Sequence, residues 1–185
     1  MPLFSFEGLT PHVHPAAFVA PTATLVGDVI VEEGASIWYG AVIRADYAPV
    51  IVRAGANVQD NAVIHGPPGL TSDIGAGATV GHNCVIHGAT LEAESLVANG
   101  AVVLDGATVG AGALVAAGSV VAARFSIPAG TLAAGSPAVV KRPVKGTGAE
   151  FWVTMNPGAY AELAQRHKTG VRFVDIPPEP DSGAE

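Results

Sequence analysis

A six-residue period runs through most of this sequence and limits its possible folds more than any other feature. Every position at this step is Val, Ile or Leu, although the step is broken by three extra residues, then by four, and later by one missing residue. The four runs are Val13, Val19, Leu25, Val31, Ile37 and Ile43; Val52, Val58 and Ile64; Ile74, Val80 and Ile86; and Leu91, Val97, Val103, Val109, Val115, Val121 and Ile127. Four residues after each, the side chain is usually small, as at Ala17, Ala35, Ala62, Cys84 and Ala101.

A period of six fits neither a helix, with 3.6 residues per turn, nor an isolated strand, with a period of two. It suits a short strand, a corner and another short strand, with the aliphatic residue inside and Gly at the strained corner. Such strands bury their apolar faces only by stacking on the next coil. The pattern resembles the hexapeptide-repeat family, which implies a left-handed parallel β-helix with three hexapeptides per coil over residues 1–140. The alternative is a β-sandwich with Gly-rich turns.

Composition excludes several classes of protein. Charged residues are only 14% of the chain, and the uncharged run 106–123 is long enough to raise the question of a membrane span. That run is rich in Gly, Ala and Ser and keeps the six-residue step, so a repeat explains it better. The net charge of −7 argues against a nucleic-acid partner. A single cysteine, Cys84, and no secretory signal pattern at the start predict a cytoplasmic protein.

The repeat stops near residue 140, and residues 141–176 form a C-terminal helical segment. Trp152, Met155, Ala159 and Leu163 share one helical face, which we expect to pack along the β-helix. The pair 156–157, Asn-Pro, resembles a helix start and predicts two helices, near 148–155 and 157–168. Residues 177–185, rich in Pro and acidic residues, are expected to form a flexible tail.

With three hexapeptides per coil, the register of the repeat brings two histidines together. Ile43, Ile64, Ile86 and Val103 take equivalent places, so the residues that follow them, including His65 and His87, share one column one coil apart. Strands are about 4.7–4.9 Å apart, which lets two imidazoles reach one ion at a zinc–nitrogen distance of about 2.0–2.1 Å.

A second column, on the preceding hexapeptides, holds Tyr39, Asp60, His82 and Asn99. His82 therefore lies on a neighbouring stretch of the coil that carries His87, and it could serve a site completed by another subunit. The remaining histidines, His12, His14 and His167, are interpreted as structural or solvent-exposed. The repeat is also interrupted after Tyr47 and after Pro68, which predicts two loops beside the histidine column, where functional residues often lie.

These residues also resemble the γ-class carbonic anhydrases and their close relatives. The matching runs are Trp38 to Asp46, Asn57 to Asn61, Val63 to His65, Gly81-His82 and His87. The resemblance implies a homotrimer with a small-molecule substrate and with Zn2+, or another divalent ion such as Fe2+, Co2+ or Ni2+, at each subunit interface. It implies that one subunit supplies His65 and His87 and that its neighbour supplies His82.

The resemblance also implies the other site residues. Arg44 and Asp46 match an interfacial ion pair with Asp60 as a nearby partner, and Gln59 matches the residue that orients metal-bound water. The implied reaction is reversible hydration of CO2 by metal-bound hydroxide, a lyase activity. Two departures weaken the match: Tyr47 stands where active members have Glu, and the segment 66–73 is short, with one acid.

Three alternatives therefore stay beside the carbonic anhydrase hypothesis. The first is a metal-dependent hydrolase of another small carbonyl compound, such as an acyl-CoA thioester. The second is a non-catalytic trimer that keeps its metal for stability. The third is a hexapeptide acyltransferase, against which the short insertions and the three stacked histidines count.

Overall fold

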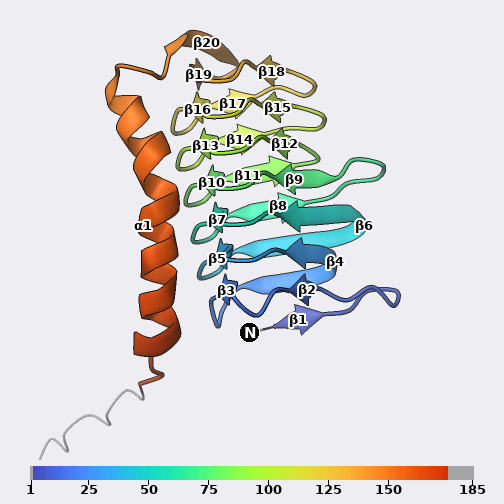
Figure 1. Ribbon diagram of the computed structural model, residues 1–185. Coiled ribbons are helices and arrows are strands. Elements are labelled where there is room, and N and C mark those ends of the chain that lie inside the picture. The colour runs from blue at the N-terminus through green and yellow to red at the C-terminus, as the bar shows by residue number, and fades with distance from the viewer. Residues whose placement is uncertain (1, 175–185) are drawn as a thin grey trace, which may run out of the picture.

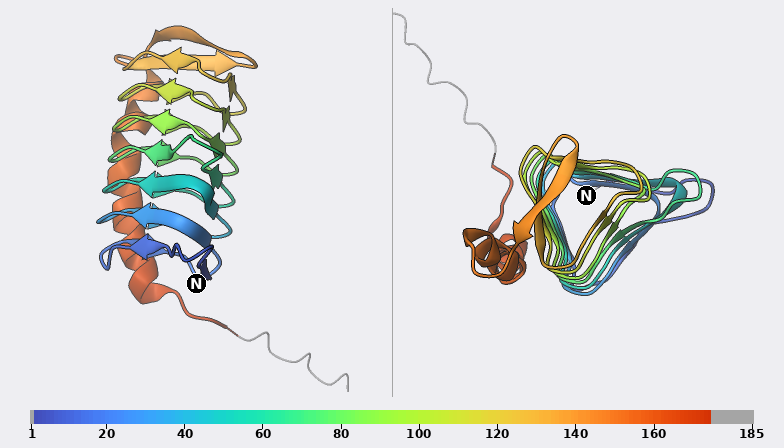
Figure 2. Two further views of the ribbon diagram at one scale, coloured as in Figure 1. Left: turned by 90° about the vertical axis from the view of Figure 1, so that its right-hand side faces the viewer. Right: turned by 90° about the horizontal axis from the view of Figure 1, so that it is seen from above.

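Short parallel strands stack into three flat faces that enclose a triangular core, as the view along the axis shows (Figure 2). The computed structural model describes residues 2–174, and it confirms the left-handed parallel β-helix, followed by one long helix outside the triangle (Figure 1). The tail expected over 177–185 lies outside the described residues.

Two of the faces share the long strands β4 and β6, which bend around a corner. The first face contains β1 (Leu3–Phe4), the first halves of β4 (Thr24–Val31) and β6 (Val42–Val52), β8 (Val63–His65), β11 (Val85–His87), β14 (Val102–Val103) and β17 (Val120–Val121). The second contains β2 (His12–Val13), the second halves of β4 and β6, β9 (Ser72–Ile74), β12 (Thr90–Leu91), β15 (Thr108–Val109) and β18 (Ser126–Ile127).

The third face is a separate sheet. It contains β3 (Phe18–Val19), β5 (Ser36–Ile37), β7 (Asn57–Val58), β10 (Thr79–Val80), β13 (Leu96–Val97), β16 (Leu114–Val115), β19 (Thr131–Gly135) and β20 (Ala138–Pro143). All its pairings are parallel except the last, where β20 runs antiparallel across β19 and closes the end of the stack.

The repeat positions form the core as predicted. Except for Val13 and Val19, which are partly buried, the aliphatic residues at the six-residue step are 0–2% exposed, and the small residues between them are almost equally buried. A buried aliphatic side chain contributes about 1.5–3 kcal/mol of hydrophobic free energy. The fold therefore derives most of its stability from this column of Val, Ile and Leu.

Strand register confirms the columns on which the site prediction rests. Ile64 pairs with Ile43 on one side and with Ile86 on the other, and His87 lies opposite His65. Val58 and Val80 likewise pair across the third face, which places Asp60 and His82 on successive coils.

Of the two interruptions, only one is a separate loop. The extra residues after Tyr47 are absorbed into β6, which continues to Val52 and pairs with β4 across a register shift. Gly27 is required there because a Cβ would lie 2.2 Å from the Ala45 carbonyl oxygen. The extra residues after Pro68 belong to the loop 66–71 between β8 and β9, beside the histidine column.

One continuous helix, α1 (Gly148–Gly170), replaces the two that the sequence predicts. Thr147 caps it by accepting a hydrogen bond from the Ala149 amide, and Pro157 lies inside it. Pro157 costs one hydrogen bond, but the residues on both sides of it pack against the same sheet, and this packing outweighs the local preference to break. Within the described part of the chain, no helix is long and apolar enough to cross a membrane.

The packed face of α1 also differs from the predicted one. Trp152 and Met155 are 57% and 50% exposed, and Ala159 is exposed as well. The helix instead turns another face to the sheet, made of Val153, Tyr160, Leu163, Ala164 and His167. Leu163 is the one member of the predicted stripe that packs against the core.

Candidate functional site at the histidine column

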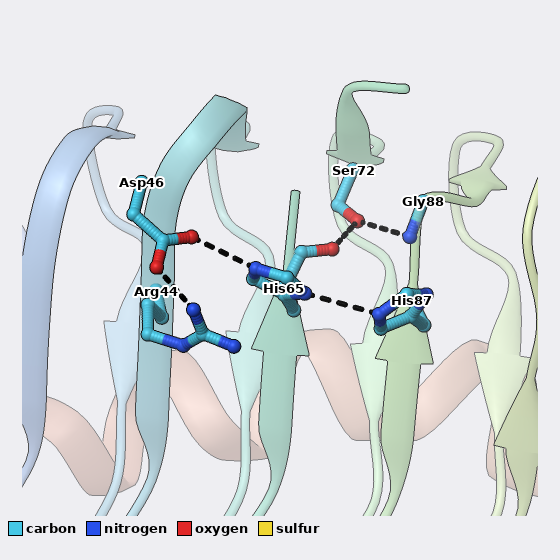
Figure 3. Close-up of polar contacts among 6 residues, drawn as sticks. All are labelled: Arg44, Asp46, His65, Ser72, His87 and Gly88. Carbon is cyan, nitrogen blue, oxygen red and sulfur yellow. Dashed lines mark hydrogen bonds and ion pairs between the residues drawn. The ribbon is translucent and has the colours of Figure 1, made fainter. Parts of the chain in front are cut away.

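His65 ends strand β8 and His87 ends strand β11, so their side chains leave adjacent coils in parallel (Figure 3). The Nδ1 atom of His65 lies 3.0 Å from the Nε2 atom of His87, and the ring centroids are 4.9 Å apart. The predicted pairing of these two histidines is thus confirmed as a direct contact.

A carboxylate holds the outer nitrogen of each ring. His65 Nε2 lies 2.9 Å from an Asp46 oxygen, and His87 Nδ1 contacts an oxygen of Asp105. An ionised carboxylate only accepts, so each outer nitrogen carries the proton and each inner nitrogen is left with a lone pair. Two lone pairs then face each other across 3.0 Å, and this arrangement is suited to sharing a cation.

Arg44 completes this polar chain as the predicted ion-pair partner of Asp46 (Figure 3). Partial burial of Asp46 would raise its pKa, but hydrogen bonds from His65 and Arg44 outweigh burial and lower that pKa below its usual value. Asp46 is therefore ionised at neutral pH and can keep His65 in one orientation.

Neighbouring residues fix the backbone of the column. The buried hydroxyl of Ser72 donates to the His65 carbonyl at 2.6 Å and accepts from the Gly88 amide at 2.9 Å. Gly66 has no room for a side chain, because a Cβ would lie 2.2 Å from the Ala48 carbonyl oxygen. Tyr47 is 69% exposed and meets the edge of the His65 ring, with centroids 6.4 Å apart.

His82 lies apart from this pair within the chain. Its Nδ1 is 2.9 Å from an Asp60 oxygen, and its Nε2 is 3.3 Å from the Tyr160 hydroxyl of α1. Asp60 therefore pairs with His82 rather than with Arg44. Burial, and then the Asp60 charge, raise the pKa of Tyr160, so its hydroxyl stays protonated.

Gln59 is buried and takes part in an internal hydrogen-bond ladder. Its side-chain amide donates to Asn57, which in turn donates to Thr79 on the next coil. Its role beside a metal-bound water stays a prediction.

The remaining histidines lie together beside the first coils. His167 packs edge-on against Trp38 and contacts the Tyr39 hydroxyl at 2.9 Å, which agrees with a structural role. His12 and His14 line a hollow next to it, under the first coil.

Sequence reasoning missed Asp105 and Tyr160. Asp105 follows Leu104, which continues the histidine column, so carrying the register one residue further would have found it. Tyr160 has no such signal, since its contact with His82 depends on how α1 docks against the sheet.

Comparison with known proteins identifies relatives along nearly the whole chain. The carnitine operon protein CaiE of Salmonella typhi is 41% identical over 172 residues, which cover 92% of this chain and 86% of the relative. The CaiE protein of Salmonella enteritidis matches equally well. The chain belongs to the CaiE family of hexapeptide-repeat proteins. No protein-family model matches it.

Solved structures agree with this membership. A Bacillus cereus protein described as a "putative acetyltransferase, product of BC4754 gene" is 34% identical, with a TM-score of 0.87 over 90% of this chain and 96% of its own. A hexapeptide transferase family protein from Anaplasma phagocytophilum is 33% identical, with a TM-score of 0.83 over 89% and 96% of the two chains.

These findings overturn the predicted carbonic anhydrase-like hydration of CO2. The full-length relatives are CaiE proteins and proteins described as transferases. Among residues 2–174, moreover, no three His, Cys, Asp or Glu side chains form a group that could hold a metal ion. The hydrolase and metal-stabilised scaffold alternatives are set aside as well, because the relatives are CaiE proteins and proteins described as transferases. The predicted stacking of three histidines, which counted against a transferase, holds only for His65 and His87, because His82 contacts Asp60 and Tyr160 instead.

Proposed function

We propose that this protein transfers acyl groups from coenzyme A thioesters to a small acceptor, with the reacting centre at His65 and His87. Two findings support the proposal. The 34% and 33% identical structures described as transferases match the whole architecture. The observation that carries it is the polar chain from Asp46 through His65 and His87 to Asp105, which presents two converging lone pairs at the surface.

In this mechanism the histidine pair is the general base. The acceptor's nitrogen or oxygen attacks the thioester carbonyl carbon while its proton passes to the inner nitrogens. The new bond to carbon forms, the carbon–sulfur bond breaks, and the departing thiolate takes the proton from the histidines. Asp46 and Asp105 hold the rings with their inner nitrogens free, which is the usual contribution of the third member of a catalytic triad.

We also propose that the same two nitrogens can hold a divalent ion, Zn2+ or one of Fe2+, Co2+ and Ni2+. The ion and the proton compete for the same lone pairs, so the histidine pair acts as the general base only in the metal-free form. The donor set fits, because nitrogens 3.0 Å apart can both lie about 2.0–2.1 Å from one ion. Carboxylates bound to the outer nitrogens are the usual supports of metal-binding histidines. The third ligand would be His82 of the partner subunit in a homotrimer. When bound, the ion would supply Lewis-acid polarisation of the thioester carbonyl.

Acyl transfer is tested by incubating the purified protein with acetyl-CoA and panels of amines and alcohols. Released coenzyme A thiol and the acylated product would both be measured. We expect His65→Ala and His87→Ala to lose roughly 10²–10⁴-fold in rate, the usual contribution of a general base. His12→Ala and His14→Ala are the matched controls and should keep full activity. Failure of the wild type to acylate any acceptor would overturn the proposal.

The ion is tested separately by elemental mass spectrometry of the purified protein before and after dialysis against a chelator. We expect about one ion per chain in the wild type and loss of the ion in His87→Ala. A metal-free but active protein would contradict the ion alone and leave acyl transfer by the histidine pair intact.

A further inference from the structure

A groove runs between the first half of α1 and the third face of the β-helix. The helix packs against β3, β5, β7 and β10, and Ala149 and Val153 of its first turns pack against the leucines of β13 and β16. Beside these contacts lies a hollow of about 620 Å³. That volume lies within the range of small-molecule sites, about 300–1,000 Å³. It is lined by Gln59, Thr79, Gly81, His82, Leu96, Val97, Ala98, Asn99, Leu114, Ala116, Ala117, Gly148, Ala149, Trp152, Asn156 and Tyr160.

The middle of the groove is apolar. Leu96 and Leu114 form a buried cluster with Val144, and Ala98 packs against this cluster. Trp152 lines the same groove from α1 with 57% of its surface exposed. A slender uncharged ligand would cover this indole and gain hydrophobic free energy without displacing any protein group.

One end of the groove carries reactive polar groups. His82 lies there between the Asp60 carboxylate and the Tyr160 hydroxyl. The Tyr160 hydroxyl lines the groove 3.3 Å from His82 Nε2, where it can donate a hydrogen bond to a carbonyl oxygen. In the proposed homotrimer, His82 would also be the residue that meets the partner subunit's histidine pair.

Beyond the other end of the groove, where Gly148 and Ala149 line it, the preceding chain segment is basic. Lys141, Arg142 and Lys145 are three of the nine Lys and Arg residues of the chain, and all three are exposed. They flank Val144, which packs against the leucines of the groove, and they lead directly into the start of α1. The one acid in the first helical turn, Glu150, is bound to the Gly146 amide. Basic side chains next to a helix N-terminus favour phosphate groups.

We propose that this groove binds the pantetheine arm of a coenzyme A thioester, with the phosphates at Lys141, Arg142 and Lys145 and the thioester at His82 and Tyr160. The inference rests on the proposed acyl transfer for its choice of ligand. A long neutral arm with anionic phosphates at one end and a reactive carbonyl at the other matches the order of basic, apolar and hydrogen-bonding groups along the groove.

Binding is measured through the fluorescence of Trp152 and by calorimetry with acetyl-CoA. The chain has one other tryptophan, Trp38, which is buried. We expect acetyl-CoA to change the emission of the wild type and leave that of Trp152→Phe unchanged. An equal change in Trp152→Phe would place the ligand elsewhere and overturn the inference.

Filling the groove gives a second test. Ala98→Trp should weaken acetyl-CoA binding at least tenfold, and Ala117→Trp at the exposed rim should do the same without touching the core. Ala111→Trp, on an exposed corner outside the groove, is the matched control and should bind normally. Equal affinity in all three variants would contradict the proposal.

The basic end is tested with Arg142→Glu combined with Lys145→Glu. This variant should lose affinity for coenzyme A at least tenfold but bind phosphate-free pantetheine like the wild type. Equal losses for both ligands would contradict the placement of the phosphates. If the protein binds acetyl-CoA in the groove but transfers no acyl group, the proposed function is wrong and the binding site stands. If Ala98→Trp transfers acyl groups with the KM of the wild type, the binding site is wrong and the proposed function stands.

Discussion

Cys84 shows at the scale of one residue how strictly the coils select side-chain size. It is fully buried at a position where the coils on either side place Ala62 and Ala101. Its thiol donates to the Ala98 carbonyl at 3.1 Å. Burial dominates its environment and raises the pKa of the thiol to about 11, although nearby backbone hydrogen bonds lower it in part. A buried thiol of this kind is inert rather than reactive.

This pKa predicts an alkaline loss of stability. The thiol of the unfolded chain ionises near its ordinary pKa of 9.0, while the folded thiol stays protonated up to about 11. The contribution of Cys84 is therefore complete below about pH 9 and is lost as the pH rises to 11, by at most about 3 kcal/mol. Urea unfolding at pH 8, 9, 10 and 11 measures it.

Cys84→Ala is the control, since Ala already occupies the equivalent positions of the neighbouring coils. The variant should lose about 1 kcal/mol or less at pH 8. Its unfolding free energy should fall less steeply above pH 9 than that of the wild type. Parallel curves for the two proteins would show that the thiol does not ionise on unfolding.

Among elements, α1 shows where local sequence signals lose to packing. The apolar stripe predicted that Trp152 packs on the β-helix, yet Trp152 is exposed. The Asn-Pro pair predicted a break between two helices, yet Pro157 lies inside one helix. The partner surface decides both outcomes, because the third face offers Trp38 and Tyr39 as a site for Tyr160 and His167. A sequence pattern carries no information about that surface.

Ala164 is the most deeply buried residue of α1, only 2% exposed, and it belongs to the main core. We expect Ala164→Leu to overpack this contact and lower the free energy of unfolding by about 1–3 kcal/mol. The matched variant Ala159→Leu lies exposed on the same helix and should leave stability within about 0.5 kcal/mol.

Chemical denaturation monitored by circular dichroism compares these two variants with the wild type. An equal effect of Ala164→Leu and Ala159→Leu would mean that α1 does not dock through the face described above.

For the whole molecule, the fold and half of the histidine site follow from the repeat alone. A fixed step of six sets the register, and register places His87 opposite His65 without any knowledge of side-chain contacts. The contacts of His82 could not be predicted from the repeat, because its neighbour Tyr160 belongs to α1, which lies outside the repeat. The function could not be predicted from the repeat either, because hydration of CO2 and acyl transfer can both use the same pair of imidazoles.

The proposed homotrimer makes a prediction about mixed assemblies. If each site takes His65 and His87 from one subunit and His82 from the next, His65→Ala and His82→Ala trimers should each be inactive. Unfolding and refolding them together at equal amounts should restore about a quarter of wild-type acyl transfer. A site is intact only where a His82→Ala subunit supplies the histidine pair and a His65→Ala neighbour supplies His82, and random assembly gives each of these two conditions a probability of about one half.

Two controls accompany this complementation. Sedimentation should give three times the chain mass for every sample, and the two variants mixed without unfolding should stay inactive. A refolded mixture with no recovered activity would show that each subunit contains its own complete site.

The antiparallel strand β20 has a consequence beyond this molecule. A stack of parallel coils has open hydrogen-bonding edges at its ends, and copies of such a stack could join end to end into fibres. The reversed β20 pairs antiparallel with β19 at the last coil and carries the exposed residues Lys141 and Arg142, so an incoming copy would meet an edge that breaks the parallel pattern and bears positive charge. The strand β20 therefore caps the end of the stack and opposes the end-to-end association to which this fold is otherwise prone.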